Sequence, residues 1–600
     1  MLGPWSCLVR RDAVVAELHG AGRMSGSNGE SADRGGIELV WPGKYTADGT
    51  RATAPPLRVR PCFEVRERVG AEDAASNRLI LGENRLVMEA LLAEPSPPQI
   101  DLIYLDPPFA VQTTHSARVS LENEGGAERA EVPAYADRFV PEVYLEMMAT
   151  RLELARKLLA PQGLLFLHCD TRASAWLRLL LDEIFSRKRF LNEIIWHYRS
   201  GGRPRDGRFA AKHDTILVYA KSKDWHLDAS AVGERRGAAK RNNMKRDVDE
   251  TGRSTFSIRS GNRVYTYAED ERMSAADVWT DISHLHQRDP QRSGYPTQKP
   301  EALLERIILA ASRPGDLVAD FFCGSGTAGV VAQRHGRRFL LSDLSELAIY
   351  TTRNRLLATT PEAAFEVATL GHGEAQQFRA EHPGNAESFR DALLTTCGLN
   401  RAETPPAHGT LADGTPVLVA ESTELAQPEL EALVARMGNA ERVVVLAWQF
   451  SDEARAFAAQ TAHVVLGRIP RSVLLPSRPP SPLVWSVPAL TAEAHYCAQR
   501  RRLEVRLESY ELELLAGPAR LAQQVRNAAH FNPLAHLAQC GVVEDAHAPR
   551  RIVASSEQAS FDVPWPAEAA VPHTLHVQTI SRFGDCDVHP VPVHVENASA

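Results

Sequence analysis

Two short segments of the chain combine residue types that could carry out a reaction together. The first is Asp106-Pro107-Pro108-Phe109, which follows the apolar residues 100–105. Two successive prolines remove two N–H donors and fix φ, so backbone carbonyl groups stay free to accept hydrogen bonds. The aspartate adds an acceptor and the phenylalanine adds a ring for stacking, so the loop suits a planar group that bears an NH₂. The same four residues are also typical of a turn that only ends a strand.

The second segment runs from Asp320 to Thr327 and reads DFFCGSGT. Its glycines allow a ligand to approach the backbone and leave free N–H groups at the start of a helix. With Gly329 they satisfy the pattern GxGxxG, and Asp343 follows where an acid would bind ribose hydroxyl groups. This arrangement fits a dinucleotide-dependent oxidoreductase, but any cofactor that contains a nucleoside can use a glycine turn and a ribose-binding acid.

The elements that must position these two loops alternate along the chain. Short apolar runs typical of buried strands are separated by stretches with helical periodicity. This alternation predicts a doubly wound α/β sheet, in which ligands bind beyond the carboxyl ends of the strands. We expect strands at 100–105, 163–168, 192–198, 215–220, 317–322 and 338–342, and helices at 84–92, 141–159, 173–185, 300–312, 327–335 and 344–356.

The pattern divides the chain into five parts. We expect residues 1–35 to be a disordered extension, 36–220 and 293–358 to be two parts of one catalytic domain, and 221–292 to be an inserted recognition region. Residues 359–600 are predicted to form a separate C-terminal α+β region, with strands at 442–448 and 463–469. Leu503, Val505 and Leu507 alternate with charged residues, which predicts a strand of an antiparallel sheet with one solvated face.

Composition and charge limit the class of protein. No apolar run among the 600 residues approaches the length of a membrane span, and the eight cysteines include no CxxC pair, so we expect a cytoplasmic protein without a disulfide framework or a zinc ribbon. The net charge is −7, but residues 186–245 contain fifteen Lys or Arg against six acids. A basic segment in an acidic protein indicates nucleic-acid binding, although a solvated loop has the same signature.

The combined motifs resemble one family, the amino-group DNA methyltransferases that use S-adenosylmethionine. Asp106–Phe109 looks like the catalytic motif of that family, 320–327 looks like its cofactor loop, and Tyr295-Pro296-Thr297-Gln298-Lys299-Pro300 looks like the segment before that loop. Their order is similar to that of the beta-arranged group, and the resemblance covers about 77–357. Phe321, where many members have proline, is a departure. The segment Ile469-Pro470-Arg471 resembles the C-terminal part of type III restriction-modification methyltransferase subunits.

The resemblance implies a role for each motif residue. The implied partners are S-adenosylmethionine and double-stranded DNA, with no metal required and no membrane, and it leaves a restriction subunit and a homodimer open. The basic segment would hold the DNA backbone. The implied catalytic residues are Asp106, Pro107, Pro108 and Phe109; the cofactor-binding residues are Asp320, Phe322, Gly324, Gly326, Thr327, Asp343, Thr297 and Lys299; and the nucleic-acid-binding residues are Arg199, Arg203, Arg205 and Arg208.

Four functions follow from these motifs. The leading hypothesis is methylation of the N6 amino group of adenine, because the catalytic loop begins with aspartate, and the near alternative is N4-cytosine methylation, which a serine at 106 would have favoured. A non-catalytic DNA-binding subunit of the same fold and an oxidoreductase are weaker alternatives. His168, Cys169 and Asp170 contain metal-ligand types, but consecutive residues on a strand point to alternate faces and cannot converge on one ion.

Overall fold

The computed structural model describes most of the chain. The described residues are 8–10, 38–52, 62–70, 77–123, 126–199, 207–237, 244–359, 363–382, 385–474, 483–497, 500, 502–531, 537–543, 550–556, 560–564, 574–583 and 586–596. Of residues 1–35 the structure describes only β1 (Leu8–Arg10), which pairs antiparallel with β2 (Glu38–Val40). Within the described ranges, no helix is both long and apolar enough to cross a membrane.

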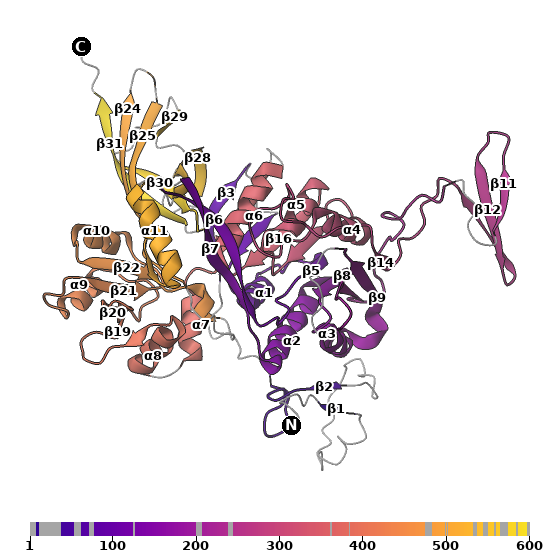
Figure 1. Cartoon of the computed structure of the whole chain (residues 1–600), viewed down its shortest axis with the longest axis horizontal. Coiled ribbons are helices and arrows are strands. Elements are labelled where there is room, and N and C mark those ends of the chain that lie inside the picture. The colour runs from indigo at the N-terminus through magenta and orange to yellow at the C-terminus, as the bar shows by residue number, and fades with distance from the viewer. Residues whose placement is uncertain are drawn as a thin grey trace.

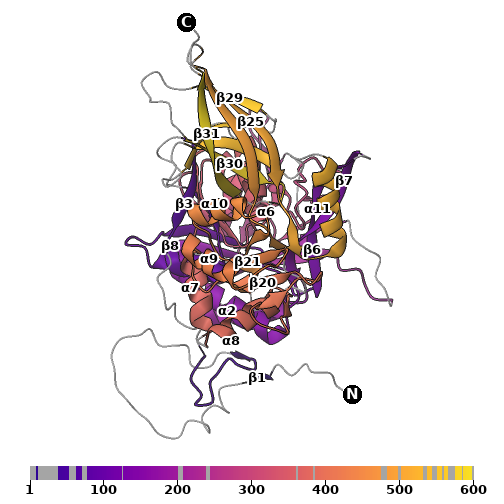
Figure 2. The ribbon, with the colours of Figure 1, turned by 90° about the vertical axis from the view of Figure 1, so that its left-hand side faces the viewer.

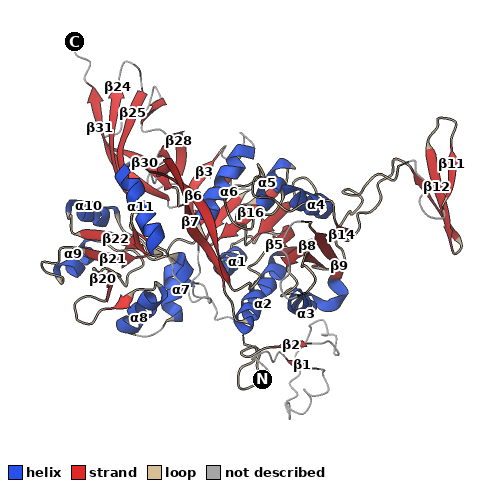
Figure 3. Cartoon of the chain, viewed as in Figure 1, coloured by secondary structure: helices blue, strands red, loops and turns tan. Residues whose placement is uncertain are grey.

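A central sheet organises the middle of the molecule (Figures 1 and 3). Six neighbouring strands are parallel, and the sheet continues through antiparallel β10 on one side and antiparallel β3 on the other. The predicted doubly wound α/β fold is confirmed. The order is β14 (Val278–Trp279), β9 (Phe190–His197), β10 (His213–Ala220), β8 (Leu159–Cys169), β5 (Ile100–Leu105), β15 (Leu317–Asp320), β16 (Arg338–Asp343), β4 (Arg78–Leu81), β17 (Phe365–Thr369) and β3 (Glu64–Val69).

Helices cover both faces of this sheet. One hydrophobic cluster joins Ile103, Leu105, Leu165 and Leu167 of the strands to α1 (Asn84–Leu92), α2 (Pro141–Leu158) and α3 (Ser174–Leu181). A second cluster joins the alternate strand residues, such as Leu102 and Tyr104, to α4 (Glu301–Ala311), α5 (Thr327–Arg334) and α6 (Glu346–Thr359). Because successive side chains point to opposite faces, a strand buried on both sides reads as a continuous apolar run.

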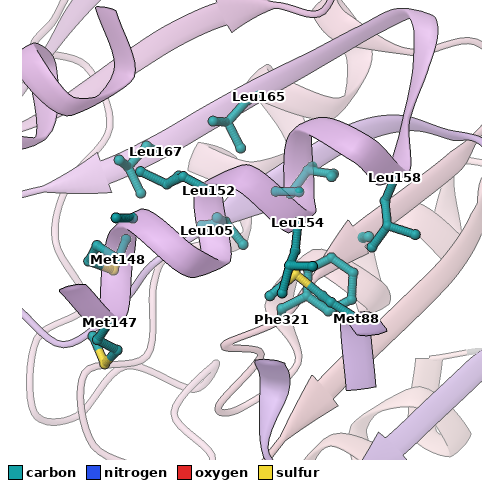
Figure 4. Close-up of a cluster of buried hydrophobic side chains, with 14 of the residues drawn as sticks. Met88, Leu105, Met147, Met148, Leu152, Leu154, Leu158, Leu165, Leu167 and Phe321 are labelled. Carbon is teal, nitrogen blue, oxygen red and sulfur yellow. The ribbon is translucent and has the colours of Figure 1, made fainter. Parts of the chain in front are cut away.

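Figure 4 shows part of the first cluster, where leucines of β8 and α2 lie around the labelled Met88 and Phe321. Phe321 is fully buried there, so the residue that departs from the family pattern serves the core. The predicted helix 173–185 is α3 followed by a π-helical turn, Asp182–Ser186.

Two insertions differ from the sequence-based expectation. A long hairpin, β6 (Thr113–Asn123) and β7 (Gly126–Asp137), follows the catalytic motif, where no element was predicted. The predicted insert 221–292, which showed no periodicity, contains a three-stranded antiparallel sheet of β11 (Lys245–Val248), β12 (Ser254–Ser260) and β13 (Arg263–Ala268). In Figure 1, β11 and β12 stand away from the rest of the protein.

The C-terminal region contains a five-stranded sheet of its own and also adds strands to the central sheet. A five-stranded sheet comprises β18 (Asn400–Arg401), β19 (Gly409–Thr410), β20 (Pro416–Val419), β21 (Val443–Ala447) and β22 (Val464–Arg468), with α7 (Gly373–Glu381), α8 (Ala386–Thr396), α9 (Gln427–Ala435) and α10 (Asp452–Gln460). β21 and β22 confirm the two predicted strands, and β17 lies beyond the predicted boundary at 358 yet pairs with β4.

A further antiparallel set follows this sheet. β25 (Arg502–Glu511) pairs antiparallel with β24 (Ala489–Cys497), and its alternating buried and exposed residues confirm the predicted solvated face. The helix α11 (Ala519–Phe531) comes next in the chain, and β28 (Arg550–Ser556) runs parallel to β3 of the central sheet.

Candidate active site

Both candidate loops leave the sheet at one topological switch point. From β5 the chain passes through α2 to β8 on one side, whereas from β15 it passes through α5 to β16 on the other. β5 and β15 are neighbours and parallel, so the loops after Leu105 and Asp320 diverge above the same edge. A crevice at such a point is where doubly wound sheets bind ligands.

A cavity of about 140 Å³ lies at this edge. Residues of both loops line it, together with the segment before α4 and the start of α1. Of the predicted site residues, Pro107, Phe109 and Gly326 are not in its lining, and nine are: Asp106, Pro108, Thr297, Lys299, Asp320, Phe322, Gly324, Thr327 and Asp343.

The Asp106 carboxylate is bound on one side and free on the other. Lys299, which lies 193 residues further along the chain, donates to Oδ2 of Asp106 and forms an ion pair with it. Oδ1 is buried and has no hydrogen-bond partner among the residues that the structure describes. A buried oxygen without a donor carries a desolvation cost that a ligand N–H group would remove. The site therefore presents one unused, charged acceptor to a ligand.

Phe109 packs beside a buried polar chain. Its ring centroid lies 5.9 Å from that of His168 and 5.3 Å from Nζ of Lys299. His168 contacts Tyr104 Oη through Nδ1 at 2.8 Å and Asp214 Oδ2 through Nε2 at 3.1 Å, and Tyr198 donates to the other oxygen of Asp214. These hydrogen bonds fix the position of the His168 ring, against which the Phe109 ring packs.

The three metal-ligand types at the end of β8 have different partners. Cys169 donates to the Thr215 carbonyl at 3.6 Å, and the Asp170 carboxylate accepts from Arg172. His168 faces Tyr104 and Asp214 instead. In the described part of the chain, no group of three or more His, Cys, Asp or Glu residues is placed to hold a metal ion.

The cofactor loop is shaped by its glycines. Gly324 and Gly326 have φ of 49° and 73°, in the left-handed region that other residues avoid. A Cβ at Gly326 would lie 2.4–2.8 Å from atoms of the Thr352 side chain, so this position also lacks room. Gly326 precedes α5 and thus directs the free N–H groups of that helix toward the cavity edge.

Two buried carboxylates frame this loop. The backbone N–H of Gly324 and that of Ser345 each donate to one oxygen of Asp343 at 2.9 Å, and the N–H of Phe322 donates to Asp320 at 3.0 Å. Burial raises the pKa of both acids, and these N–H groups oppose the rise. A cationic or hydroxyl-bearing ligand group would supply donors to the oxygens and favour their ionised form.

Thr327 and Thr297 have partners of their own. The Thr327 hydroxyl accepts from Arg355 of α6 at 3.0 Å and donates to the Lys299 carbonyl at 3.4 Å. It therefore links the cofactor loop to α6 and to the segment before α4. Thr297 has a φ of 56°, which is strained for a β-branched residue, and its hydroxyl is 3.1 Å from Tyr135 Oη on β7. The predicted segment before the loop is thus tied to the hairpin.

A buried ion-pair network was missed by the sequence analysis. Arg151 of α2 binds the carboxylate of Glu83 and donates to Asn84 at 2.6 Å, and Asn84 donates to the carbonyl of Phe321 in the cofactor loop. These contacts hold one wall of the cavity, and Glu83 also caps α1. The polar pair Glu83-Asn84 before a helical stretch was the available signal.

The network continues into the C-terminal region. The backbone N–H of Glu83 donates to Glu374 at 3.0 Å, and Glu374 accepts from Arg471 at 2.8 Å. Arg471 belongs to the segment that resembled type III subunits, so this segment supports the cavity wall through Glu374.

The predicted DNA-binding arginines lie only partly within the described structure. Arg199 and Arg208 are exposed and flank residues 200–206, and Arg203 and Arg205 lie outside the described residues. Arg199 follows β9 directly, at the same edge of the sheet as the cavity.

Comparison with known proteins agrees with this geometry. Residues 100–354 match a family model described as DNA methylase. The chain is 29% identical over 340 residues to the type II methyltransferase M.EcaI of Enterobacter cloacae, covering 48% of this chain and 72% of the relative. It is 26% identical over 274 residues to the DNA adenine methyltransferase YhdJ of Escherichia coli, covering 45% and 81%.

A weaker match covers a similar share of the chain. A probable type III restriction-modification enzyme HindVI Mod subunit of Haemophilus influenzae is 22% identical over 412 residues, covering 50% of this chain and 51% of the relative. The family match contains both candidate loops, the segment between Tyr295 and Pro300, and Asp343. Residues 100–354, which include all of these elements, match the DNA methylase family model.

Proposed function

We propose that this chain transfers a methyl group from S-adenosylmethionine to the N6 amino group of adenine in DNA. The observation that carries the proposal is the Asp106 carboxylate, which stands beside the cofactor loop with one buried oxygen unused. A relative named as a DNA adenine methyltransferase supports adenine as the base. N4-cytosine methylation is the alternative, and aspartate rather than serine at 106 favours adenine.

The residues around the cofactor loop fit S-adenosylmethionine. Asp343 has lone pairs to offer the ribose hydroxyl groups, because Oδ2 accepts from Gly324, Oδ1 accepts from Ser345, and a carboxylate oxygen can accept from more than one donor. Asp320 is buried and would hold the ammonium group, and Phe322 lines the cavity with an apolar ring. The bound cofactor supplies an electrophilic methyl group on a positively charged sulfur.

The catalytic loop would activate the amino group. The N6 lone pair of adenine is delocalised into the ring and becomes nucleophilic when both N–H bonds are drawn to acceptors. Asp106 Oδ1 is one acceptor and the Pro107 carbonyl is the other, while Lys299 holds the Asp106 carboxylate in place through Oδ2. The target base must leave the duplex, and Phe109 offers it a stacking face.

We propose double-stranded DNA as the partner and the cytoplasm as the location. Arg199 and Arg208 would bind phosphate groups beside the cavity edge, and the insert 221–292 would contribute to recognition. The similarity to a type III Mod subunit supports a restriction subunit as a further partner.

Product analysis tests this function. The purified protein is incubated with methyl-labelled S-adenosylmethionine and unmethylated DNA of high sequence complexity, and the DNA is digested to nucleosides. We expect label in N6-methyldeoxyadenosine and none in the Asp106→Asn control. Label in N4-methyldeoxycytidine would replace adenine with cytosine, and cofactor binding without any incorporation would favour the non-catalytic alternative.

A further inference from the structure

The backbone directly after the catalytic motif is strained. Ala110 and Gln112 have φ of 55° and 60°, and neither is glycine. Non-glycine residues in the left-handed region persist only where surrounding contacts hold them. The structure therefore has to supply a restraint for this turn, and the turn sets the direction in which Asp106–Phe109 leaves the sheet.

Asp137 supplies that restraint. Its Oδ2 accepts from the N–H of Phe109 at 3.0 Å, and its Oδ1 accepts from the N–H of Ala110 at 2.6 Å. The carbonyl of Asp137 accepts from the N–H of Gln112 at 2.8 Å. Asp137 is 2% exposed, so its charge-assisted hydrogen bonds are shielded from water. One residue thus accepts hydrogen bonds from three backbone N–H groups of the strained turn, those of Phe109, Ala110 and Gln112.

The β6–β7 hairpin brings Asp137 to this place. Asp137 is the last residue of β7, and the outer part of the hairpin packs through Val119, Leu121 and Val132 into the hydrophobic cluster of α11 and the C-terminal strands. Figure 2 shows α11 beside β6 and β7. Nearer the site, Ala117 packs against Tyr295, and the N–H of Arg118 donates to the Gly294 carbonyl at 3.3 Å.

We propose that Asp137 is a positioning residue for methyl transfer, and that the C-terminal region supports it through the β6–β7 hairpin. The inference rests on the proposed role of the Asp106–Phe109 loop. Asp137 sets the position of Phe109 and, through the short rigid motif, that of the Asp106 carboxylate. Asp137 is not among the residues that line the cavity, so we assign it no contact with the base or the cofactor.

The test separates positioning from binding and folding. Asp137→Asn keeps the size of the side chain but turns an NH₂ toward a backbone N–H, so the turn loses one of its bonds. We expect single-turnover methyl transfer to total DNA to fall by about ten-fold to a hundred-fold, the scale of a small misplacement in an active site. Affinities for S-adenosylmethionine and for DNA should stay within about two-fold of wild type on this account.

Two further variants test the inference even if Asp137→Asn disturbs folding. Glycine tolerates the φ of residue 110, so Ala110→Gly added to Asp137→Ala should recover a large part of the lost rate. Leu521→Ala, which loosens α11 against the hairpin, should lower the rate in the same direction with cofactor affinity unchanged.

Three results would overturn the inference. They are a wild-type rate in Asp137→Asn, an equal loss of rate and cofactor affinity in that variant, and no recovery in the double variant. Failure of the proposed function itself would appear differently, because the wild-type protein would then transfer no methyl group to DNA.

Discussion

The catalytic loop and the cofactor loop leave neighbouring strands of one sheet but are held in different ways. In the cofactor loop, glycines occupy the positions of positive φ, and short-range bonds close the turn: the N–H of Gly326 donates to the Cys323 carbonyl at 2.7 Å, and that of Phe322 to the Asp320 side chain. Asp343, on the next strand of the chain, completes the loop. Its own glycines and short bonds shape this turn, and Asn84, Thr352 and Arg355 hold it from outside.

The catalytic loop depends on distant parts of the chain. Its positive φ values fall on Ala110 and Gln112, and its partners are Asp137 on the hairpin and Lys299 before α4. A turn whose positive φ values fall on non-glycine residues relies on its partners more than a turn built on glycines does, so changes elsewhere in the fold displace it more easily. We therefore expect cofactor binding to be more robust than methyl transfer to substitutions outside the two loops.

The largest effect is expected for Asp106→Ala. It removes a preorganised charge that acts mainly as the amino group becomes cationic, so single-turnover methyl transfer should fall by about 10²–10³. Cofactor affinity, measured by calorimetry, should fall less. A rate near wild type would show that the loop Asp106–Phe109 is not the catalytic centre.

Gly326→Ala should disrupt the cofactor loop next most strongly. The new Cβ would combine a φ of 73° with a clash against Thr352, and these two costs together are about 2–4 kcal/mol. We expect at least a ten-fold loss of S-adenosylmethionine affinity. Gly336→Ala is the matched control, because its φ is 70° but the space around its Cβ is open. Equal losses in the two variants would mean that the close approach to Thr352 does not matter.

Asp343→Ala should weaken cofactor binding by about 1–3 kcal/mol, because it removes a charged acceptor for the ribose and leaves two N–H groups without a partner. Asp343→Asn keeps one acceptor and should lose less. The single-turnover rate at saturating cofactor should change little in both variants, since the catalytic loop has other supports. Wild-type affinity in calorimetry would assign the ribose to another acid.

The sequence allowed the cofactor loop to be predicted more completely than the catalytic loop. The reason is that the cofactor loop is marked by local sequence patterns, whereas the catalytic loop is supported by residues far away in the sequence. A glycine turn after a buried strand and an acid after the next strand are local patterns, and parallel strands bring both to one edge. The motif Asp106–Phe109 was equally visible. Its supports were not, because no local rule connects Asp137 or Lys299 to a loop 27 or more residues away.

The remaining errors concern inserted and buried polar elements. The alternation of Val119 and Leu121 with polar residues would have indicated β6, but the hairpin finds its apolar partners in α11, nearly 400 residues later, and in the C-terminal strands. Glu83 and Arg151 look like solvent-facing residues of helices, and only the tertiary structure buries them as a pair. Such pairs are invisible to periodicity because their burial depends on what packs over them.

The smallest effect is expected for Ala110→Gly, and its sign tests the strain assigned to the catalytic loop. A left-handed alanine costs about 1–2 kcal/mol, and glycine avoids this cost but loses about 0.5–1 kcal/mol more chain entropy on folding. The substitution should therefore raise the midpoint of urea unfolding slightly, by the equivalent of about 0.5–1 kcal/mol, and leave methyl transfer within about two-fold of wild type while Asp137 holds the turn. Ala93→Gly is the matched control, because Ala93 has a φ of −88° at the end of α1 and glycine there brings only the entropic loss. The two midpoints should move in opposite directions, and a parallel decrease would show that the catalytic loop carries no strain that glycine can relieve.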